Sequence, residues 1–382
     1  MAIGNYQNVL LQERGFNAST LGLVNAVLSA VSIVAVPIWG MISDRIRSIR
    51  SIFLITLIGG STLFAFVPTL VGLPFMNTPL LLCTLPVIYF FRNPTGSMLD
   101  NWQVRYCNQK RLSYGFIRAF GSLGFTIVGL SITGLISSKG TTWTFPVCAA
   151  LMSIVVVIAL FIEDVKPISL PVAEGEKAKK PKLNPAVLFK EYYYSTFLIF
   201  VFLLWLACNC IMPFIPYLLN ELGIPSSRYG VVNSYVALLE IPMLIAAQPL
   251  RRWIPLHLLA LGGGVCYILT GILLGLCAES LTAVIIIETF HGLGSGLLIA
   301  SCANYVFTLV PEELKATGQS LYVAAASLAG IVGNLAGGAL IDTLGARAFY
   351  CILSCTSVIA VLFLGATLIF GTKVLKRKIP TF

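Results

Sequence analysis

The sequence has 382 residues, of which 57% are hydrophobic and only 10% are charged, and its mean hydropathy is +0.90. A water-soluble protein of this length could not cover its surface with so few charges, so the composition excludes that class and indicates a membrane protein with many spans. The formal net charge of +10 does not by itself indicate a nucleic-acid partner, because the basic residues follow a regular distribution along the chain.

Apolar segments of spanning length alternate with short polar loops, which predicts an all-α membrane protein. We place spans near residues 18–42, 51–72, 78–106, 112–137, 142–163, 193–219, 226–250, 254–277, 280–309, 316–341 and 346–370. Of the 25 Lys and Arg residues, nineteen lie in alternate loops and the C-terminal tail, four lie in the other loops, and Arg92 and Arg118 lie inside spans. This positive-inside pattern predicts a cytosolic C-terminus in a cell membrane, and we expect no nucleic-acid partner.

The longest polar stretch, residues 164–192, is rich in Lys, Pro and Glu. We interpret it as a cytosolic linker between an N-terminal helical bundle (1–163) and a C-terminal one (193–382). The halves match after a shift of 208 residues, with eight identities between VLLQERGFNASTLGLVN (9–25) and YLLNELGIPSSRYGVVN (217–233). Two parallel repeats joined by a basic linker are typical of transporters.

The repeat predicts a first-half counterpart of the span at 193–219, of which only the tail MAIGNYQNVLL is present. Eleven residues of helix rise ~16 Å and cannot cross ~30 Å of hydrocarbon. We therefore expect two six-helix pseudo-repeats with the first helix largely missing, which leaves about eleven full spans. The alternative is that Met1 opens a short extracellular arm.

Asp100 and Arg118 are charged residues inside predicted spans, where an isolated charge costs at least ~2.5 kcal/mol. They flank an expected cytosolic turn near Cys107–Lys110, so an antiparallel hairpin would place both at equal depth, ~13 Å from the turn. We interpret the pair as a solute site at the midplane, and a structural salt bridge is the alternative. Phe125, two turns beyond Arg118 on the same face, would stack on a ring-shaped solute or simply pack.

Glu288 and His291 are three residues apart and so share one face of a predicted helix. A carboxylate beside an imidazole can titrate near neutral pH, as proton coupling requires, and a structural pair is the alternative. Glu240, shortly before Pro242, is a weaker candidate for the same role. Arg92 is expected to face protein or water at a broken stretch of helix, and no role is assigned to it.

No signature of an enzyme occurs in the sequence, which has no GxxxxGK[ST] phosphate loop, metal cluster or nucleophile motif. The ten cysteines lie mostly in apolar runs without disulfide or metal spacing, so we expect them to be packing residues. We therefore expect no catalytic activity, no metal and no cofactor, and an ion gradient rather than ATP as the energy source.

Two stretches resemble motifs of the major facilitator superfamily. PIWGMISDRIRSIR (37–50) resembles its loop motif, in which Gly40, Asp44 and Arg45 take matching positions and Arg47 replaces a glycine. YGFIRAFGSLGF (114–125) resembles the fifth-helix motif of lactose permease and of the nucleoside and phenylpropionate proton symporters. The resemblance covers nearly the whole chain and implies a two-bundle fold, alternating access, a conformational role for the loop motif and a monomer.

The resemblance to lactose permease also implies a substrate site. Its residues would be Asp100, Arg118, Phe125, Asn233 and His291. Gly230 and Gly294 stand where the permease has glutamates, and Glu288 stands where it has lysine. Proton symport is implied by the family, and our hypothesis assigns it to Glu288, His291 and Glu240.

We predict a secondary active transporter that moves a small polar solute, such as a sugar or nucleoside, by alternating access and proton symport. The alternative is an exporter of drugs, aromatic acids or lipids that lacks the sugar-type site. A receptor would be favoured by a collapsed central cavity, and a channel by a pathway open to both sides.

Overall fold

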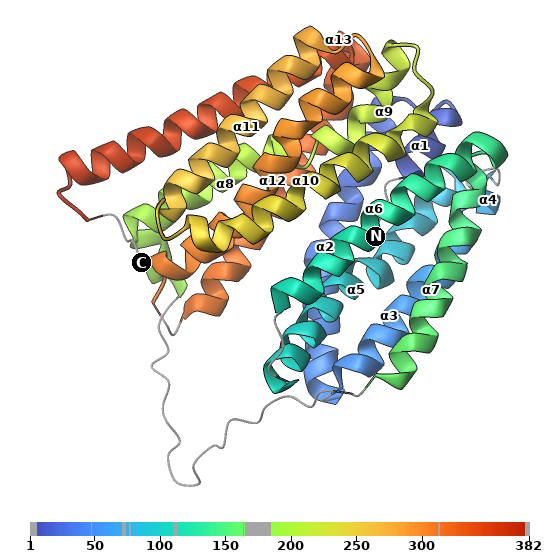
Figure 1. Ribbon diagram of the computed structural model, residues 1–382, viewed down its shortest axis with the longest axis horizontal. Helices are drawn as coiled ribbons and strands as arrows, with labels where there is room; N and C mark the ends of the chain where they lie inside the picture. Colours follow the sequence, from blue (N-terminus) through green and yellow to red (C-terminus); the bar gives the residue numbers. More distant parts are fainter. Residues whose placement is uncertain are drawn as a thin grey trace. The chain divides into compact units, whose positions relative to one another are not determined.

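The computed structural model describes residues 6–46, 48–70, 74–75, 78–110, 114–162, 164, 185–311 and 314–378. Nearly all of these residues are helical (Figure 1). Within the described ranges, strands are limited to β1 (Pro74–Phe75) and β2 (Thr78–Pro79), which pair antiparallel. The predicted all-α fold class is therefore confirmed.

The first part of the chain follows the predicted order of helices. Its elements are α1 (Tyr6–Glu13), α2 (Ala18–Ile46), α3 (Ile49–Ala65), α4 (Val67–Leu70), α5 (Leu80–Lys110), α6 (Tyr114–Lys139), the 3-10 turn η1 (Thr141–Trp143) and α7 (Thr144–Phe161). The span predicted at 51–72 is divided, because α3 ends where the N–H of Phe66 bonds back to Leu63 and Phe64.

The second part contains longer and more regular helices. Its elements are η2 (Pro185–Lys190), α8 (Tyr192–Cys208), α9 (Ile211–Glu221), η3 (Ser226–Arg228), α10 (Tyr229–Leu250), α11 (Leu256–Cys277), α12 (Leu281–Leu309) and α13 (Lys315–Lys373). The span predicted at 193–219 is broken between α8 and α9, where the Asn209 amide donates to Ala326 O at 3.0 Å.

Helix α13 consists of two helices that meet at Gly345, where φ is +83°. This φ favours glycine, and it separates the two spans that the sequence predicts at 316–341 and 346–370. The N–H of Ala346, the first residue after the bend, donates to Oε1 of Glu221 at 2.5 Å. The carboxylate therefore satisfies an amide at the start of the second helix.

Seven helical segments within the described residues are long and apolar enough to cross a membrane. Helix α7 exposes a nearly continuous apolar surface that includes Ile154, Val157 and Ile158, each more than half exposed. Such a surface suits lipid rather than water. The chain is therefore a multi-pass membrane protein, and the count of about eleven spans with a stub of the first stays a prediction.

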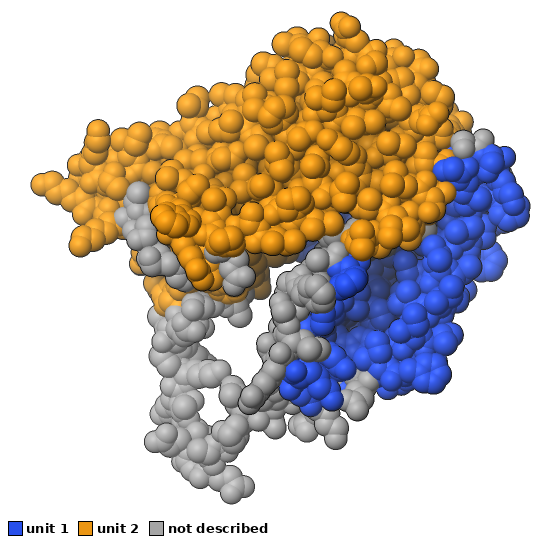
Figure 2. All heavy atoms as spheres, viewed as in Figure 1, with its two compact units in different colours: residues 1–6, 27–121, 134–181 blue, residues 7–26, 122–133, 182–382 orange. Residues whose placement is uncertain are grey.

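The chain divides into two compact units (Figure 2). Unit 1 contains residues 1–6, 27–121 and 134–181, and unit 2 contains residues 7–26, 122–133 and 182–382. The core of unit 1 joins α2, α3, α5 and α7 around Trp39, Phe53 and Trp102. The indole N–H of Trp39 donates to Phe90 O at 3.0 Å, which ties α2 to α5. The predicted division at the 164–192 linker is not tested by these units and stays a prediction.

Unit 2 packs α8, α10, α11, α12 and α13 against one another and includes α1, the start of α2 and the middle of α6. Gly15 and Gly223, which are 208 residues apart, both have a positive φ, at +82° and +68°. Each follows a short helix, α1 or α9, that ends in a glutamate. The two halves thus repeat a local backbone conformation as well as a sequence, as the alignment of 9–25 with 217–233 predicts.

Candidate functional site

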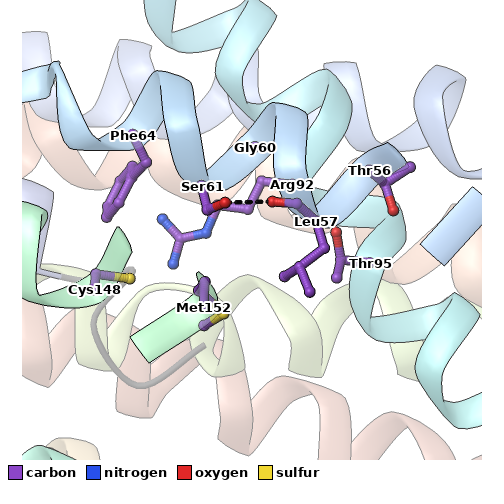
Figure 3. A pocket seen from close by; sticks show the side chains of 9 residues that line it. All are labelled: Thr56, Leu57, Gly60, Ser61, Phe64, Arg92, Thr95, Cys148 and Met152. Carbon is purple, nitrogen blue, oxygen red and sulfur yellow. Dashed lines mark hydrogen bonds between the residues drawn. The ribbon is translucent and has the colours of Figure 1, made fainter. Parts of the chain in front are cut away.

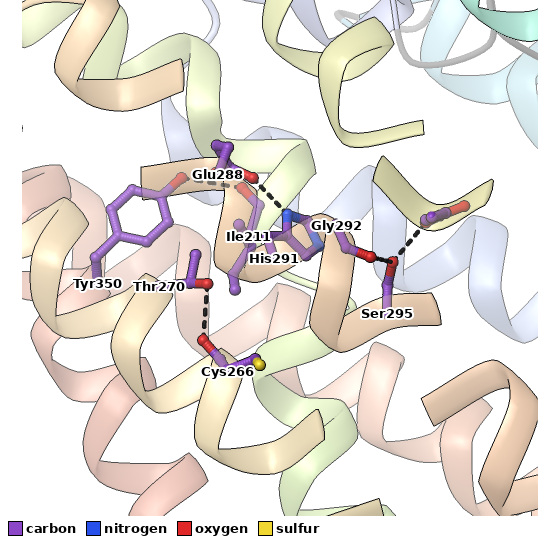
Figure 4. A network of polar contacts seen from close by, with 9 residues as sticks. Ile211, Cys266, Thr270, Glu288, His291, Gly292, Ser295 and Tyr350 are labelled. Atoms are coloured by element: carbon purple, nitrogen blue, oxygen red, sulfur yellow. Dashed lines mark hydrogen bonds and ion pairs between the residues drawn. The ribbon is translucent and has the colours of Figure 1, made fainter. Parts of the chain in front are cut away.

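The structure brings Glu288 and His291 into direct contact on one face of α12 (Figure 4). Their shared helix turn places Oε2 of Glu288 2.5 Å from Nδ1 of His291. The Glu288 side chain has no exposed surface and His291 is 4% exposed. An acid and an imidazole in contact away from water can hold a proton between them, so this pair is the most distinctive chemical group among the described residues.

The surroundings of the pair are mainly aromatic and apolar. The ring of His291 meets the ring of Tyr267 edge-on, with centroids 5.2 Å apart. The hydroxyl of Tyr350 donates to Ile211 O at 2.9 Å. Oε1 of Glu288 has no hydrogen-bond partner in the described part of the chain. Half of the carboxyl group is therefore unsatisfied, which is costly unless a proton or another group occupies it.

Glu240 reaches the same helix from α10. The hydroxyl of Ser295 donates to Oε1 of Glu240 at 2.6 Å, and Ser295 lies one turn beyond His291 on α12. Sequence reasoning predicted Glu240 but missed Ser295, because a serine four residues from a histidine is too common to mark a site. The contact places Glu240 beside the polar face of α12 that carries Glu288 and His291.

Small residues bring α10 and α12 close enough for this contact. A Cβ atom added to Gly292 would lie 2.9 Å from Val236 O, and one added to Gly296 would lie 3.1 Å from Glu240 O. Tyr235 and Thr289 add a hydroxyl–hydroxyl bond of 3.0 Å across the same interface. The glycines therefore fix the spacing at which Glu240 meets Ser295.

Gly294, which replaces a glutamate of the lactose permease pattern, faces α11. A Cβ atom there would lie 2.8 Å from Cβ of Cys266 and 3.2 Å from Gly263 O. A glutamate side chain has no room in this packing, so the departure from the permease pattern has a steric reason. Any acid that carries protons on α12 must therefore occupy another position, such as Glu288.

The position expected for the turn between Asp100 and Arg118, near Cys107–Lys110, is wrong. Residues Cys107–Lys110 lie within α5, and α6 begins at Tyr114. Asp100 is thus ten residues before the end of α5, about 15 Å, and Arg118 is four residues after the start of α6, about 6 Å. Measured from these helix ends, Asp100 and Arg118 do not lie at the equal depth that the sequence predicts. The Arg118 side chain lies outside the described part of the structure, so a direct pair stays a prediction.

Phe125 and Asn233 lie on two helices that come close together in unit 2. Gly129 of α6 is so near Ser234 of α10 that an added Cβ would overlap its hydroxyl oxygen. Asn233 precedes Ser234 and is 7% exposed, and Phe125 lies one turn before Gly129 and is half-buried. Both residues therefore border one helix contact, and their role in binding a solute is untested.

The residues of the expected loop motif lie at the end of α2 (Ala18–Ile46). Gly40 has open space around its Cα, and Arg45 is exposed in the last helical turn. The Asp44 side chain and Arg47 fall outside the described residues. The conformational role of Gly40, Asp44 and Arg45 therefore stays a prediction.

Comparison with known proteins identifies the family. Residues 2–352 match the MFS_1 like family. The chain belongs to this family. An uncharacterized transporter, YwbF of Bacillus subtilis, is 25% identical over 91% of this chain and 84% of its own length. The maltose permease of Geobacillus stearothermophilus is also 25% identical, over 94% of this chain and 88% of its own length.

Solved structures agree with this assignment at the level of the fold. A point mutant of the nucleoside transporter NupG superimposes with a TM-score of 0.79 at 16% identity, and the match covers 96% of this chain and 94% of that one. A bacterial homologue of the lysosomal transporter Spinster has a TM-score of 0.64 at 14% identity, with coverage of 97% and 91%. The predicted major facilitator fold is thus confirmed, and the relatives of this family member are transporters.

Proposed function

We propose that this family member imports a small polar solute, such as a sugar or a nucleoside, by alternating access and proton symport. The observation that carries the proposal is the contact between buried Glu288 and His291 inside an apolar helix of a transporter-family chain. Burying an acidic side chain inside a membrane protein costs free energy, and ionisable residues at such positions usually belong to functional sites. Proton transfer is the chemistry that such a pair supports best.

The class of solute rests on separate support. A relative over nearly the whole chain is named a maltose permease, and a neighbour in fold is a nucleoside transporter. Both names specify neutral solutes rich in hydroxyl groups. Asp100 and Arg118 suit such solutes, because a carboxylate accepts hydroxyl hydrogen bonds and a guanidinium donates to oxygen. In this proposal Phe125 and Asn233 complete the binding site, and Glu288, His291 and Glu240 couple transport to protons.

The basic loops support a further part of the proposal, namely a monomer in the cell membrane with its C-terminus in the cytosol. The described tail agrees in composition, since Lys373 ends the last apolar helix and Lys376, Arg377 and Lys378 follow it. An impermeant thiol reagent applied to intact cells should therefore fail to label a cysteine added after Lys378.

A thermal-shift panel tests the solute site. Sugars, nucleosides and aromatic acids would each be added to the purified wild type, to Arg118→Ala and to the control Arg228→Ala. Arg228 is an exposed arginine at the start of α10, outside the proposed site. A ligand at 100 times its Kd should stabilise the wild type by ~2.7 kcal/mol. We expect one class to stabilise the wild type and Arg228→Ala and to lose its effect in Arg118→Ala.

Two outcomes would contradict this assignment. Equal stabilisation of Arg118→Ala and wild type would remove Arg118 from the site. Stabilisation only by drugs, aromatic acids or lipids would replace the importer of polar solutes with the alternative, an exporter of those compounds.

A further inference from the structure

A cavity of about 50 Å³ lies inside unit 1, between α3, α5 and α7 (Figure 3). Most of its wall is buried, including Thr56, Leu57 and Phe64 of α3 and Cys148 of α7. Its single charged group is Arg92 of α5. The volume exceeds the ~10–15 Å³ that one water needs, so the space can hold a small ion with its nearest water.

The guanidinium of Arg92 points into this cavity, between Phe64, Cys148 and Met152 (Figure 3). Its Cζ lies 4.0 Å from the centroid of the Phe64 ring and 5.6 Å from that of Tyr89. These rings contact the guanidinium through cation–π interactions, which use none of its N–H donors. Nη1 is buried and has no hydrogen-bond partner within the described part of the chain.

No carboxylate of the described residues forms an ion pair with Arg92. Asp100, on the same helix, is eight residues away, which is ~12 Å along the axis. Arg92 is partly buried, and its Nη1 is shielded from solvent without a partner, which is unfavourable for a charged group. An arginine never loses its proton in a protein, so it cannot escape this cost by becoming neutral. A negative charge in the cavity would remove the cost.

The other polar groups of the cavity specify what kind of anion fits. Each of three hydroxyls donates within its own helix: Thr56 to Phe53 O at 3.0 Å, Ser61 to Leu57 O at 2.6 Å and Thr95 to Phe91 O at 3.2 Å. Their protons are therefore already used. Apart from the weak S–H donor of Cys148, Arg92 supplies the donors of the lining side chains and their one positive charge. A phosphate or sulfate needs more donors and more positive charge than Arg92 supplies. A monovalent anion of halide size fits the single charge of Arg92 and the size of the cavity.

We propose that this cavity binds one small monovalent anion, such as chloride, through the guanidinium of Arg92. The ion neutralises Arg92 and fills the space between α3, α5 and α7. The site is separate from the residues proposed to bind the solute or carry protons, so it stabilises unit 1 whatever the transported solute is.

Thermal unfolding of the purified full chain tests the site. Chloride would be replaced by gluconate at constant ionic strength, since gluconate is too large for the cavity. We expect chloride to raise the Tm of the wild type in a saturable way by at least about 2 °C. Arg92→Met should lose this dependence. The matched control Arg50→Met should keep it, because Arg50 bonds to Leu160 O and Ile162 O outside the cavity.

Equilibrium binding of radioactive chloride gives a second readout. It uses only the wild-type protein, so it does not require that any variant folds. We expect one chloride per chain, displaced by bromide and nitrate and not by sulfate or gluconate. The proposal would be overturned by a wild-type Tm that is equal in chloride and gluconate, by an unchanged chloride effect in Arg92→Met, or by an absence of chloride binding.

Discussion

Replacing Glu288 by glutamine should abolish solute accumulation driven by a proton gradient while it leaves solute exchange intact. Glutamine keeps the size of the side chain and can still bond to His291, so the packing around this fully buried residue should survive. A glutamine side chain cannot bind and release a proton, and proton-driven transport of the solute needs that step. We expect uphill uptake to fall at least about tenfold, which corresponds to ~1.4 kcal/mol. Exchange of labelled for unlabelled solute needs no net proton movement and should continue.

Glu279→Gln provides the matched control for this prediction. Glu279 is an exposed acid just before α12, so the same chemical change there should leave uptake at the wild-type level. Uptake by Glu288→Gln that kept its full rate and proton dependence would make the Glu288–His291 contact purely structural. Loss of both uptake and exchange, with normal folding, would instead place Glu288 in solute binding.

The positions of most helices could be predicted from the sequence, because an apolar run of spanning length has few alternatives to a helix in a membrane. The predicted span at 254–277 corresponds to α11 (Leu256–Cys277), and the span at 280–309 corresponds to α12 (Leu281–Leu309). The interruptions could not be predicted as well. Asn209, at the break between α8 and α9, bonds to Ala326 on α13, a partner that no local pattern reveals.

The candidate site was predictable only where its residues are neighbours on one helix. The spacing of Glu288 and His291 requires a shared face, and the structure places them in contact. The partner of Glu240 was missed because Ser295 belongs to another helix and lies 55 residues away. The error in the turn between Asp100 and Arg118 has a similar origin, since α5 continues through the polar residues Asn108–Lys110 and a hydropathy pattern ends the span too early.

The environment of Arg92 shows the same limit. The expected break in the helix at Arg92 is wrong, because α5 continues from Leu80 to Lys110 with Pro94 inside it. The side chain was expected to face protein or water, and it contacts Phe64, Tyr89, Cys148 and Met152. These residues come from three helices. A cavity built by residues so far apart in the chain has no signal in a single sequence.

Replacing Gly338 by alanine should destabilise the protein, although alanine is the better helix former. A Cβ atom at Gly338 of α13 would overlap Ala18 O and lie 2.9 Å from Cα of Ser19 at the start of α2, and backbone cannot move as easily as a side chain. Overpacking of this kind costs about 1–3 kcal/mol. Gly22 makes the reciprocal contact, where an added Cβ would overlap Asn334 O, so Gly22→Ala should have a similar effect.

Gly365→Ala, in the second of the two helices of α13, is the control, because a Cβ there meets nothing within 4 Å. Gain of helix propensity should stabilise this variant by up to ~1 kcal/mol, so thermal unfolding should shift the two alanine variants in opposite directions. Equal stability of Gly338→Ala and Gly365→Ala would show that α2 and α13 do not pack this closely in solution.

The contact that Gly338 allows should also control how easily an external reagent reaches the start of α2. One carboxylate of α13, that of Asp342, accepts hydrogen bonds from the N–H groups of Ala18 at 2.9 Å and Ser19 at 2.8 Å. This caps the first turn of α2, at the end that the charge distribution predicts to be extracellular. In the alternating-access cycle that we propose, such contacts between the two repeats would break and form again. We therefore expect Gly338→Ala to increase labelling of a Ser19→Cys reporter by an impermeant maleimide, whereas Gly365→Ala should leave labelling unchanged. Unchanged labelling in Gly338→Ala would show that the start of α2 stays on α13 despite the added methyl group.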